Sequence, residues 1–233
     1  GVQNFRTRSC FVAMLPFPCK KGGFQMFSYR TIAPHTLELL KQLCQEPYLK
    51  ECRLVGGTAL ALQYGHRTSV DLDFFGSFDK EEDILFTVLQ PYAEVRKIKD
   101  SPNIKIFFMD DIKVDFVNYS IYPWIDDAVE EDGLRLASPK DIAAMKINAI
   151  EGRGSKKDFI DIFSLLHHYS LEEILQFYSQ KYPNYSIYRA LKSMVYFADA
   201  DPKDMPTLFI DDSWEDVKSY IKEQVAIYEN SVH

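Results

Sequence analysis

Two aspartates, Asp71 and Asp73, stand in a segment that otherwise has the pattern of a strand. In SVDLDFFG they alternate with the apolar Val70, Leu72 and Phe74. Side chains two positions apart on a strand point to the same face. An ionised carboxylate is costly to bury unless a positive group meets it. The pair therefore predicts either an exposed strand end or a site for a cation.

A third aspartate, Asp115, lies in KVDFV, where it shares one face of a later strand with Lys113. If this strand lies beside the first, three carboxylates converge and repel one another by on the order of a few kcal/mol per pair. Magnesium prefers oxygen ligands of this kind. Two such ions about 4 Å apart can stabilise the attacking and leaving oxygens of a phosphoryl transfer. We therefore predict that Asp71, Asp73 and Asp115 bind metal.

A glycine turn precedes the aspartate pair. Gly56 and Gly57 allow the backbone to approach a phosphate, and a helix expected to begin near Thr58 offers free N–H groups. Arg67 and Ser69, just ahead of the aspartates, are further candidates for contact with a triphosphate. A Gly-Gly pair alone is more often a plain turn, and a lone DxD is weak evidence. Their combination with KVDFV favours a metal–triphosphate site.

The three aspartates converge only if their strands pair in a sheet, and the periodicity of the sequence predicts such strands. CRLV indicates a short strand that leads through the glycine turn into a helix ending at Gly65. MDDI indicates a hairpin turn between two further strands. Helical periodicity is present in 33–49 and 79–92, and strand periodicity in 69–76, 93–99, 103–109 and 112–119.

From Ser138 the chain is predicted to be helical, with capping signals in SPKD, SKKD and SLEE, a helix over 185–197 and a last helix from Trp214. We predict the α+β class, a mixed sheet with flanking helices followed by a helical domain. The expected parts are an extension without a fold role (1–27), an α/β domain (28–137) and a helical domain (138–233), with the active site in the cleft between the domains.

The composition adds exclusions. The chain has 233 residues, 46% of them apolar, and a net charge of −7, which gives no overall attraction for nucleic acid or an anionic membrane. No stretch has the length of a membrane span. We expect reduced thiols in a cytoplasmic protein, because no cysteine spacing suits a metal or requires a disulfide. The cysteines are Cys10, Cys19, Cys44 and Cys52.

Four motifs occur in order, namely GGTALAL, HRTSVDLDFF, KVDFV and MKINAIEGRGSKKDFIDIFSLL. Together they resemble the DNA polymerase β-like nucleotidyltransferase superfamily, and more narrowly the AbiEii/AbiGii-type nucleotidyltransferase toxins of bacterial toxin–antitoxin and phage-defence systems. The resemblance covers about residues 56–166. The broader superfamily usually has serine after the glycine, whereas here Thr58 follows a second glycine, as in many toxin-like members.

The resemblance implies transfer of a nucleoside monophosphate from an NTP to the 3′ end of tRNA or to a protein hydroxyl. It also implies two Mg²⁺ ions, or Mn²⁺, and a cognate antitoxin as a partner. Gly57 and Thr58 would hold the triphosphate. Asp71 and Asp73 would hold both metal ions, and Asp115 would help to activate the acceptor hydroxyl. The alternatives are transfer to a small molecule, as in antibiotic-modifying relatives, and an inactive module that binds nucleotide or a partner protein.

The helical motif would contribute Lys146 and an aspartate, either Asp158 or Asp161. Asp158 stands three residues after Ser155, where a capping box needs an acid, so we expect it mainly to cap its helix. Asp161 has no such role, and we expect it to orient Lys146 or Arg153 toward the nucleotide phosphates. The plainer interpretation of Lys146 is a solvated or snorkelling side chain.

Further charged and aromatic residues complete the expectations. Lys113 and Arg153 are candidates for contact with the nucleotide, and the pair His167-His168 is interpreted as helix surface. A local basic group favours contact with phosphate or RNA over a merely solvated face. This basic group consists of Lys140, Lys146, Arg153, Lys156 and Lys157. Aromatic residues expected in the core of the helical part are Phe177, Tyr178, Tyr188, Tyr196 and Phe197.

Overall fold

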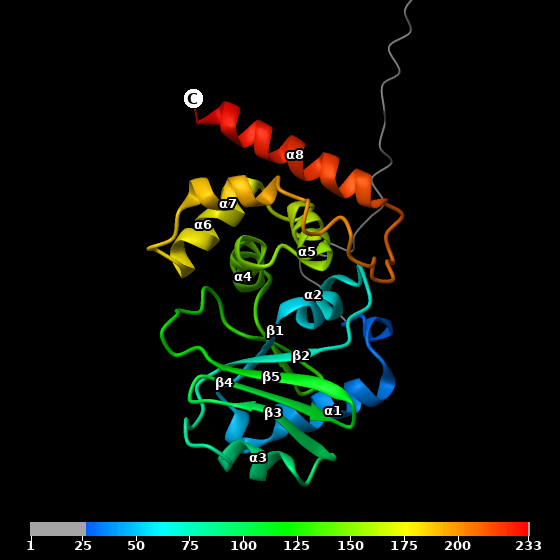
Figure 1. Ribbon diagram of the computed structural model, residues 1–233, viewed down its shortest axis with the longest axis vertical. Coiled ribbons are helices and arrows are strands. Elements are labelled where there is room, and N and C mark those ends of the chain that lie inside the picture. Colours follow the sequence, from blue (N-terminus) through cyan, green and yellow to red (C-terminus); the bar gives the residue numbers. More distant parts are fainter. Residues whose placement is uncertain (1–26, 233) are drawn as a thin grey trace, which may run out of the picture.

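The computed structural model describes residues 27–232, which form one mixed sheet with helices around it (Figure 1). The sheet has seven strands in the order β3-β4-β5-β2-β1-β7-β6. The predicted α+β class is confirmed. The strands are β1 (Arg53–Val55), β2 (Leu72–Gly76), β3 (Val95–Asp100), β4 (Ile104–Met109), β5 (Ile112–Asn118), β6 (Val129–Glu131) and β7 (Leu134–Leu136).

A parallel pair, β2 and β5, lies at the centre of the sheet, and its outer neighbours β1 and β4 are antiparallel to it. β4 and β5 are joined by the predicted hairpin, in which Asp110 and Asp111 have φ values of 46° and 66°. Left-handed values at both positions are what a type I′ turn requires. The periodicity does not predict β6 and β7, because three residues each are too few for alternation to show.

One face of the sheet is packed into the core. Leu72, Phe74 and Phe116 are buried there, and α3 (Ile84–Leu89) reaches the same face because its Phe86 ring lies 6.4 Å from the ring of Phe107. In Figure 1, α1 (Pro34–Gln45) and α3 lie on the side of the sheet away from α2 (Gly56–Tyr64) and the C-terminal helices. Asp73 and Asp115, which alternate with these buried residues, therefore belong to the other face.

The C-terminal part is helical, as predicted, and its helices lie beyond α2 (Figure 1). Ser138, Ser155 and Ser170 occupy the N-cap positions that the sequence indicates. No helix within residues 27–232 has the length and apolar composition needed to cross a membrane. The helices are α4 (Pro139–Gly152), α5 (Lys156–Leu166), α6 (Leu171–Lys181), α7 (Ile187–Met194) and α8 (Trp214–Ser231), and two short 3-10 helices cover Tyr29–Thr31 and Pro47–Leu49.

Buried polar contacts hold the helices to the segment that follows β5. Lys181 and Asp141 form an ion pair of 2.8 Å with both side chains fully buried. The hydroxyls of Tyr119 and Tyr182 lie 2.6 Å apart. The division into domains at 137/138 stays a prediction. Most of the predicted extension lies outside the described residues, but Phe27 is buried in the core.

The aromatic prediction for the helical part is only partly correct. Tyr188 and Tyr196 are 68% and 56% exposed, so the prediction of core positions is wrong for these two. The helix α7 turns Ala190 and Met194 inward, which leaves Tyr188 on its outer side. Buried or partly buried, as predicted, are Phe177, Tyr178 and Phe197.

Candidate active site

The strands that carry the aspartates are neighbours. β2 and β5 pair in parallel with Asp73 directly opposite Asp115, so the predicted convergence of these two carboxylates is confirmed. Asp71 immediately precedes β2 and alternates with Asp73, which places it toward the same face. We call Asp71, Asp73 and Asp115 the carboxylate row.

The carboxylate row lacks enough positive partners. Burial, and then the charge of Asp115, raise the pKa of Asp73 to about 6. Asp115 accepts a hydrogen bond from Lys113 at 2.5 Å through Oδ2, but its Oδ1 is buried without a partner among the described residues. A buried acceptor left unpaired costs about 1–3 kcal/mol. A cation or a substrate hydroxyl bound here would remove that cost.

The donor atoms of the carboxylate row suit a hard metal ion, but their arrangement in this structure is not that of a formed metal site. Within residues 27–232, no three His, Cys, Asp or Glu side chains already form a group that could hold a metal ion. The row nevertheless offers only oxygen donors, which Mg²⁺ prefers. The unpaired Oδ1 of Asp115 and the raised pKa of Asp73 are both features that a bound cation would reverse.

The glycine turn lies directly against this row. Gly56 has φ +69°, and a Cβ at that position would stand 2.7 Å from Oδ2 of Asp73. A Cβ at Gly57 would stand 2.0 Å from Nη2 of Arg67. Both distances exclude a side chain, so the glycines are required by the neighbouring carboxylate and guanidinium. The helix α2 begins at Gly56, two residues before the predicted start at Thr58.

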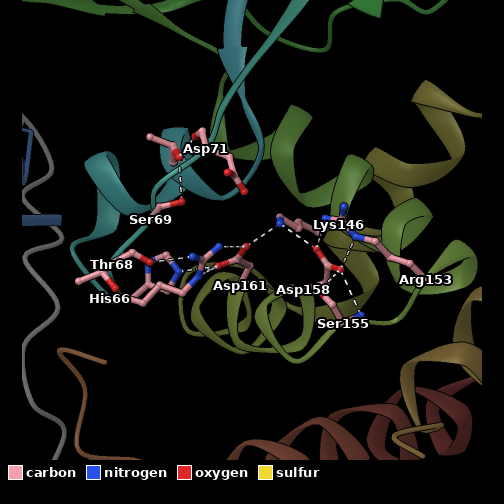
Figure 2. Close-up of polar contacts among 11 residues, drawn as sticks. His66, Thr68, Ser69, Asp71, Lys146, Arg153, Ser155, Asp158 and Asp161 are labelled. Carbon is pink, nitrogen blue, oxygen red and sulfur yellow. Dashed lines mark hydrogen bonds and ion pairs between the residues drawn. The ribbon is translucent and has the colours of Figure 1, made fainter. Parts of the chain in front are cut away.

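Thr58 holds the segment before β2 against the first turn of α2. Its side chain is buried. Its Oγ1 lies 2.8 Å from Oγ of Ser69 and also donates to the backbone carbonyl of Asp71. Both contacts attach the start of the carboxylate row to the N-terminus of α2, whose N–H groups and dipole favour an anion. Figure 2 shows Ser69 and Asp71 together in this position.

Next to the row lies a set of paired charges, most of them buried, which Figure 2 also shows. Asp161 on α5 is its centre and is fully buried. Arg67 binds both oxygens of Asp161, through Nε at 2.7 Å and Nη2 at 2.8 Å. Nζ of Lys146 lies 2.6 Å away and Nε2 of His66 2.7 Å away. We call this set the charge cluster, and its members are His66, Arg67, Lys146, Arg153, Asp158 and Asp161.

Asp158 has two roles at once. It completes a capping box with Ser155 at the start of α5. It also accepts from Lys146 at 2.9 Å and from Arg153 at 2.9 Å and 3.0 Å. The prediction that Asp158 is mainly a cap is therefore wrong, because both cations converge on it. Asp161 does hold Lys146, as expected, but it does not bind Arg153.

The carboxylates of the charge cluster are paired with cations that hold their charge, whereas the carboxylate row has too few cations. Burial alone would raise the pKa of Asp161, but Arg67 and Lys146 hold it well below its ordinary range. Burial lowers the pKa of His66, so the imidazole is neutral near pH 7. Three cations thus face two carboxylates, an excess of one positive charge. Lys146 and Arg153 both act on Asp73, so this excess lies beside the row.

Two candidate nucleotide contacts have protein partners instead. Arg67 is 2% exposed, and its guanidinium is bound to Asp161. Lys113 is paired with Asp115. In each case the positively charged side chain forms an ion pair with a nearby carboxylate of the protein. Their contact with a nucleotide stays a prediction, as do the phosphate contacts of Ser69 and Arg153.

The predicted basic group is only partly at the surface, because two of its five members are buried. Lys146 belongs to the charge cluster, Lys140 has an ion pair of 2.9 Å with Asp126, and Lys156 is buried. Within the described part of the chain, Lys157 is exposed and has no ion pair. Contact of this group with phosphate or RNA therefore stays a prediction, and Arg153 and Lys157 are its exposed members.

His66 is the member of the charge cluster that the sequence does not indicate. It is 1% exposed, and its Nδ1 has no hydrogen-bond partner among residues 27–232. The one signal is its position next to Arg67 in HRTS. That signal becomes informative only once the 66–67 segment is known to lie on α5, because Asp161 then meets both side chains.

Comparison with known sequences gives two matches. The model of the family described as "Nucleotidyl transferase AbiEii toxin, Type IV TA system" matches residues 38–224. An uncharacterized protein of Aquifex aeolicus (strain VF5) is 35% identical over 206 residues, which is 85% of this chain and 98% of that relative.

Comparison with solved structures gives more distant matches. MenT4, a nucleotidyltransferase toxin from Mycobacterium tuberculosis H37Rv, is similar with a TM-score of 0.50 at 14% identity, over 82% of this chain and 80% of that chain. JHP933 from Helicobacter pylori has a TM-score of 0.49 at 18% identity, over 86% of this chain and 94% of that chain. At such identity the likeness to MenT4 concerns the fold alone.

Proposed function

This chain belongs to the AbiEii family of nucleotidyltransferase toxins, and we propose that it transfers a nucleoside monophosphate from an NTP to a hydroxyl acceptor with the help of Mg²⁺. One observation carries the proposal. Asp73, which lies against Gly56 at the N-terminus of α2, is directly opposite Asp115 in the central parallel pair, and Oδ1 of Asp115 is buried without a hydrogen-bond partner among the described residues.

The candidate residues form two groups, one that would bind the metal ion and the NTP and one that would act on the acceptor. Bound Mg²⁺, or Mn²⁺, stabilises charge on phosphate oxygens, and Asp71 and Asp73 would hold it. The first turn of α2, from Gly56 to Thr58, would bind the triphosphate through its free N–H groups. Lys146 and Arg153 would place positive charge beside the leaving group.

Asp115 would act on the acceptor side. The acceptor oxygen forms a bond to the α-phosphorus, the bond from that phosphorus to the oxygen shared with the β-phosphate breaks, and pyrophosphate leaves. The proton of the acceptor hydroxyl would pass to Asp115, whose Oδ1 accepts no hydrogen bond from residues 27–232. Lys113 at 2.5 Å would keep the other oxygen in place.

We further propose, on the basis of family membership, that the acceptor is a macromolecule, either the 3′ end of a tRNA or a protein hydroxyl. A cognate antitoxin would be the regulatory partner. The family is described as a toxin of a type IV toxin–antitoxin system, and this description supports both statements.

Labelled nucleotides test the proposal. The protein would be incubated with NTPs labelled at the α-phosphate, Mg²⁺, and either total RNA, a protein extract or candidate small molecules. Wild type should label RNA or protein, and Asp73→Asn should not. Asp111→Asn is the matched control, because Asp111 is an exposed turn residue next to β5 with φ 66°, which asparagine tolerates.

Two outcomes would overturn the proposal. Equal labelling by Asp73→Asn would remove the metal role of the carboxylate row. Label found solely in small molecules would exclude the macromolecular acceptor while keeping nucleotidyl transfer.

A further inference from the structure

The face of the sheet that carries the carboxylate row continues across β4 to the edge strand β3. We propose that this open face is the surface along which a single-stranded polynucleotide acceptor reaches Asp115. The proposal rests on the proposed function and adds the acceptor class and its path. In Figure 1, β2, β5, β4 and β3 follow one another away from α2 and the C-terminal helices.

The strand register places two rows of side chains on this face. The first runs from Asp115 on β5 through Ile106 on β4 to Lys99 on β3. The second, next to it, runs from Lys113 through Phe108 to Arg96. Neighbouring strands lie about 4.8 Å apart, so Lys99 and Asp115 are roughly 10 Å apart along the sheet. We call Arg96, Lys99, Ile104, Ile106 and Phe108 the open strip.

The two faces of these strands differ sharply in burial. On β4, Phe107 and Met109 are fully buried against the core. On the open side, Ile104 is 37% exposed, and Ile106 and Phe108 are partly exposed. An apolar strip that starts at the candidate site and that no part of residues 27–232 fully covers is suited to contact with a ligand.

The two positively charged side chains of the open strip can bind a ligand. Arg96 and Lys99 are exposed and have no ion pair within residues 27–232, although the whole chain carries a net charge of −7. Lys97, between them on β3, belongs to the opposite face, where it is paired with Asp83 and Asp100. Unpaired cations in line with the site complement the phosphates of a polynucleotide backbone.

The aromatic residue makes a polynucleotide the better fit. The guanidinium of Arg96 lies over the ring of Phe108, 5.0 Å from its centroid. An aromatic ring with a guanidinium group beside it, together with unpaired cations, is the combination to which the bases and phosphates of single strands bind. A protein acceptor would need acidic side chains to match Arg96 and Lys99, and it would make no comparable use of the stacked pair.

Binding of a fluorescein-labelled single-stranded oligoribonucleotide tests the open strip. The test variant is Arg96→Ala/Lys99→Ala. The matched control is Lys80→Ala/Lys97→Ala, which also removes two exposed cations, neither of them in the open strip. Anisotropy titrations over a range of salt concentrations would give the Kd and its salt dependence. NTP affinity and melting temperature would be measured on the same proteins.

We expect the test variant to raise the Kd about tenfold and to lower the salt slope by about 1.4, since each lost phosphate contact removes about 0.7. Phe108→Leu should raise the Kd by at least about fivefold, because it removes base stacking. The control should bind RNA within about twofold of wild type, because its cations lie off the path. NTP affinity should be unchanged in all variants.

Three results would overturn the open strip as the acceptor path. These are absence of RNA binding by wild type, equal weakening in test variant and control, and transfer to protein substrates alone. Each leaves NTP binding and transfer intact, so the proposed function would stand. Absence of transfer to every acceptor would instead remove the proposed function, and the RNA titrations would still decide whether the open strip binds a polynucleotide.

Discussion

Asp73 and Asp161 are chemically identical side chains in opposite surroundings. Asp161 is fully buried, yet Arg67, Lys146 and His66 bind it and its pKa is held well below the ordinary range. Asp73 faces Asp115, and its pKa is raised to about 6. The charge cluster therefore has its counter-charges built into the protein, whereas the carboxylate row requires a positive charge from outside.

This difference distinguishes carboxylates that can bind a ligand from carboxylates that stabilise the fold. A carboxylate whose partners are all supplied by the protein positions those partners, and removing it leaves buried cations unpaired. A carboxylate with an unmet charge can receive a metal ion or a proton. The contrast predicts that substitutions in the row should affect activity and leave the fold intact, while substitutions in the cluster should affect stability first.

The largest expected effect is the loss of activity in Asp73→Asn. Transfer should fall below detection, because Asp73 is proposed to hold the metal and the substitution removes its charge. The free energy of unfolding in metal-free buffer should stay equal or rise slightly, because one repulsive buried charge is removed. Turnover of labelled NTP and urea denaturation would measure both. A marked loss of stability would erase the distinction between row and cluster.

The next effect is on stability in Asp161→Ala. Removing this carboxylate leaves the buried Arg67 without its partner and leaves Lys146 with Asp158 alone, so the free energy of unfolding should fall by about 3–5 kcal/mol. Asp216→Ala is the control, because Asp216 completes an exposed capping box at α8 and should cost about 1 kcal/mol. Urea denaturation compares the two. Equal losses would show that the cluster contributes no more than a helix cap.

The charge cluster should also govern stability in acid. The folded-state pKa of Asp161 lies below its unfolded value, so its stabilisation is present above about pH 4 and is lost as the pH falls. Between about pH 5 and pH 2, Asp161→Asn should lose roughly 2 kcal/mol less than wild type. Urea titrations across this range give the slopes. If Asp161→Asn does not fold, Asp158→Asn should show the same flattening, because the pKa of Asp158 is also lowered. Parallel slopes would mean that the pairs do not hold the charge.

The smallest expected effect concerns Gly57, which lies against Arg67 of the charge cluster. Gly57→Ala would place a Cβ 2.0 Å from Nη2 of Arg67, so it should cost about 1–2 kcal/mol and displace that guanidinium. Gly152→Ala is the control, because nothing lies within 4 Å of the added Cβ and it sits in α4. That variant should be neutral or about 0.5 kcal/mol more stable. Melting curves separate the two, and equal effects would show that Arg67 is free to move.

Local patterns predicted the row and, within the cluster, the pairing of Lys146 with Asp161, but not the pairing of Arg67 or His66. Alternation in SVDLDFF and KVDFV sets which side chains share a face, and the mutual fit of two buried faces then brings Asp73 opposite Asp115. Capping at Ser155 is likewise local. The partner of Arg67 is Asp161, 94 residues later. No local rule selects that partner, because it depends on how α5 lies against the segment before β2.

Contacts between elements far apart in the sequence also explain why the core position predicted for Tyr188 is wrong and why Lys156 of the basic group is buried. Composition indicates an aromatic residue or a lysine, but the helix rotation decides whether it meets a partner. Lys156 is buried and Tyr188 is exposed, the reverse of what their side chains suggest alone.

The pairing of Arg67 with Asp161 also sets an order of events during synthesis. Arg67 leaves the ribosome 94 residues before its partner, and contacts of such separation form late in folding. Until α5 has emerged, Arg67 has no counter-charge at its place beside Gly57, and the first turn of α2 lacks its final support. A nascent chain ending before α5 is therefore expected to be inactive, which would delay toxicity until the helical part has been made.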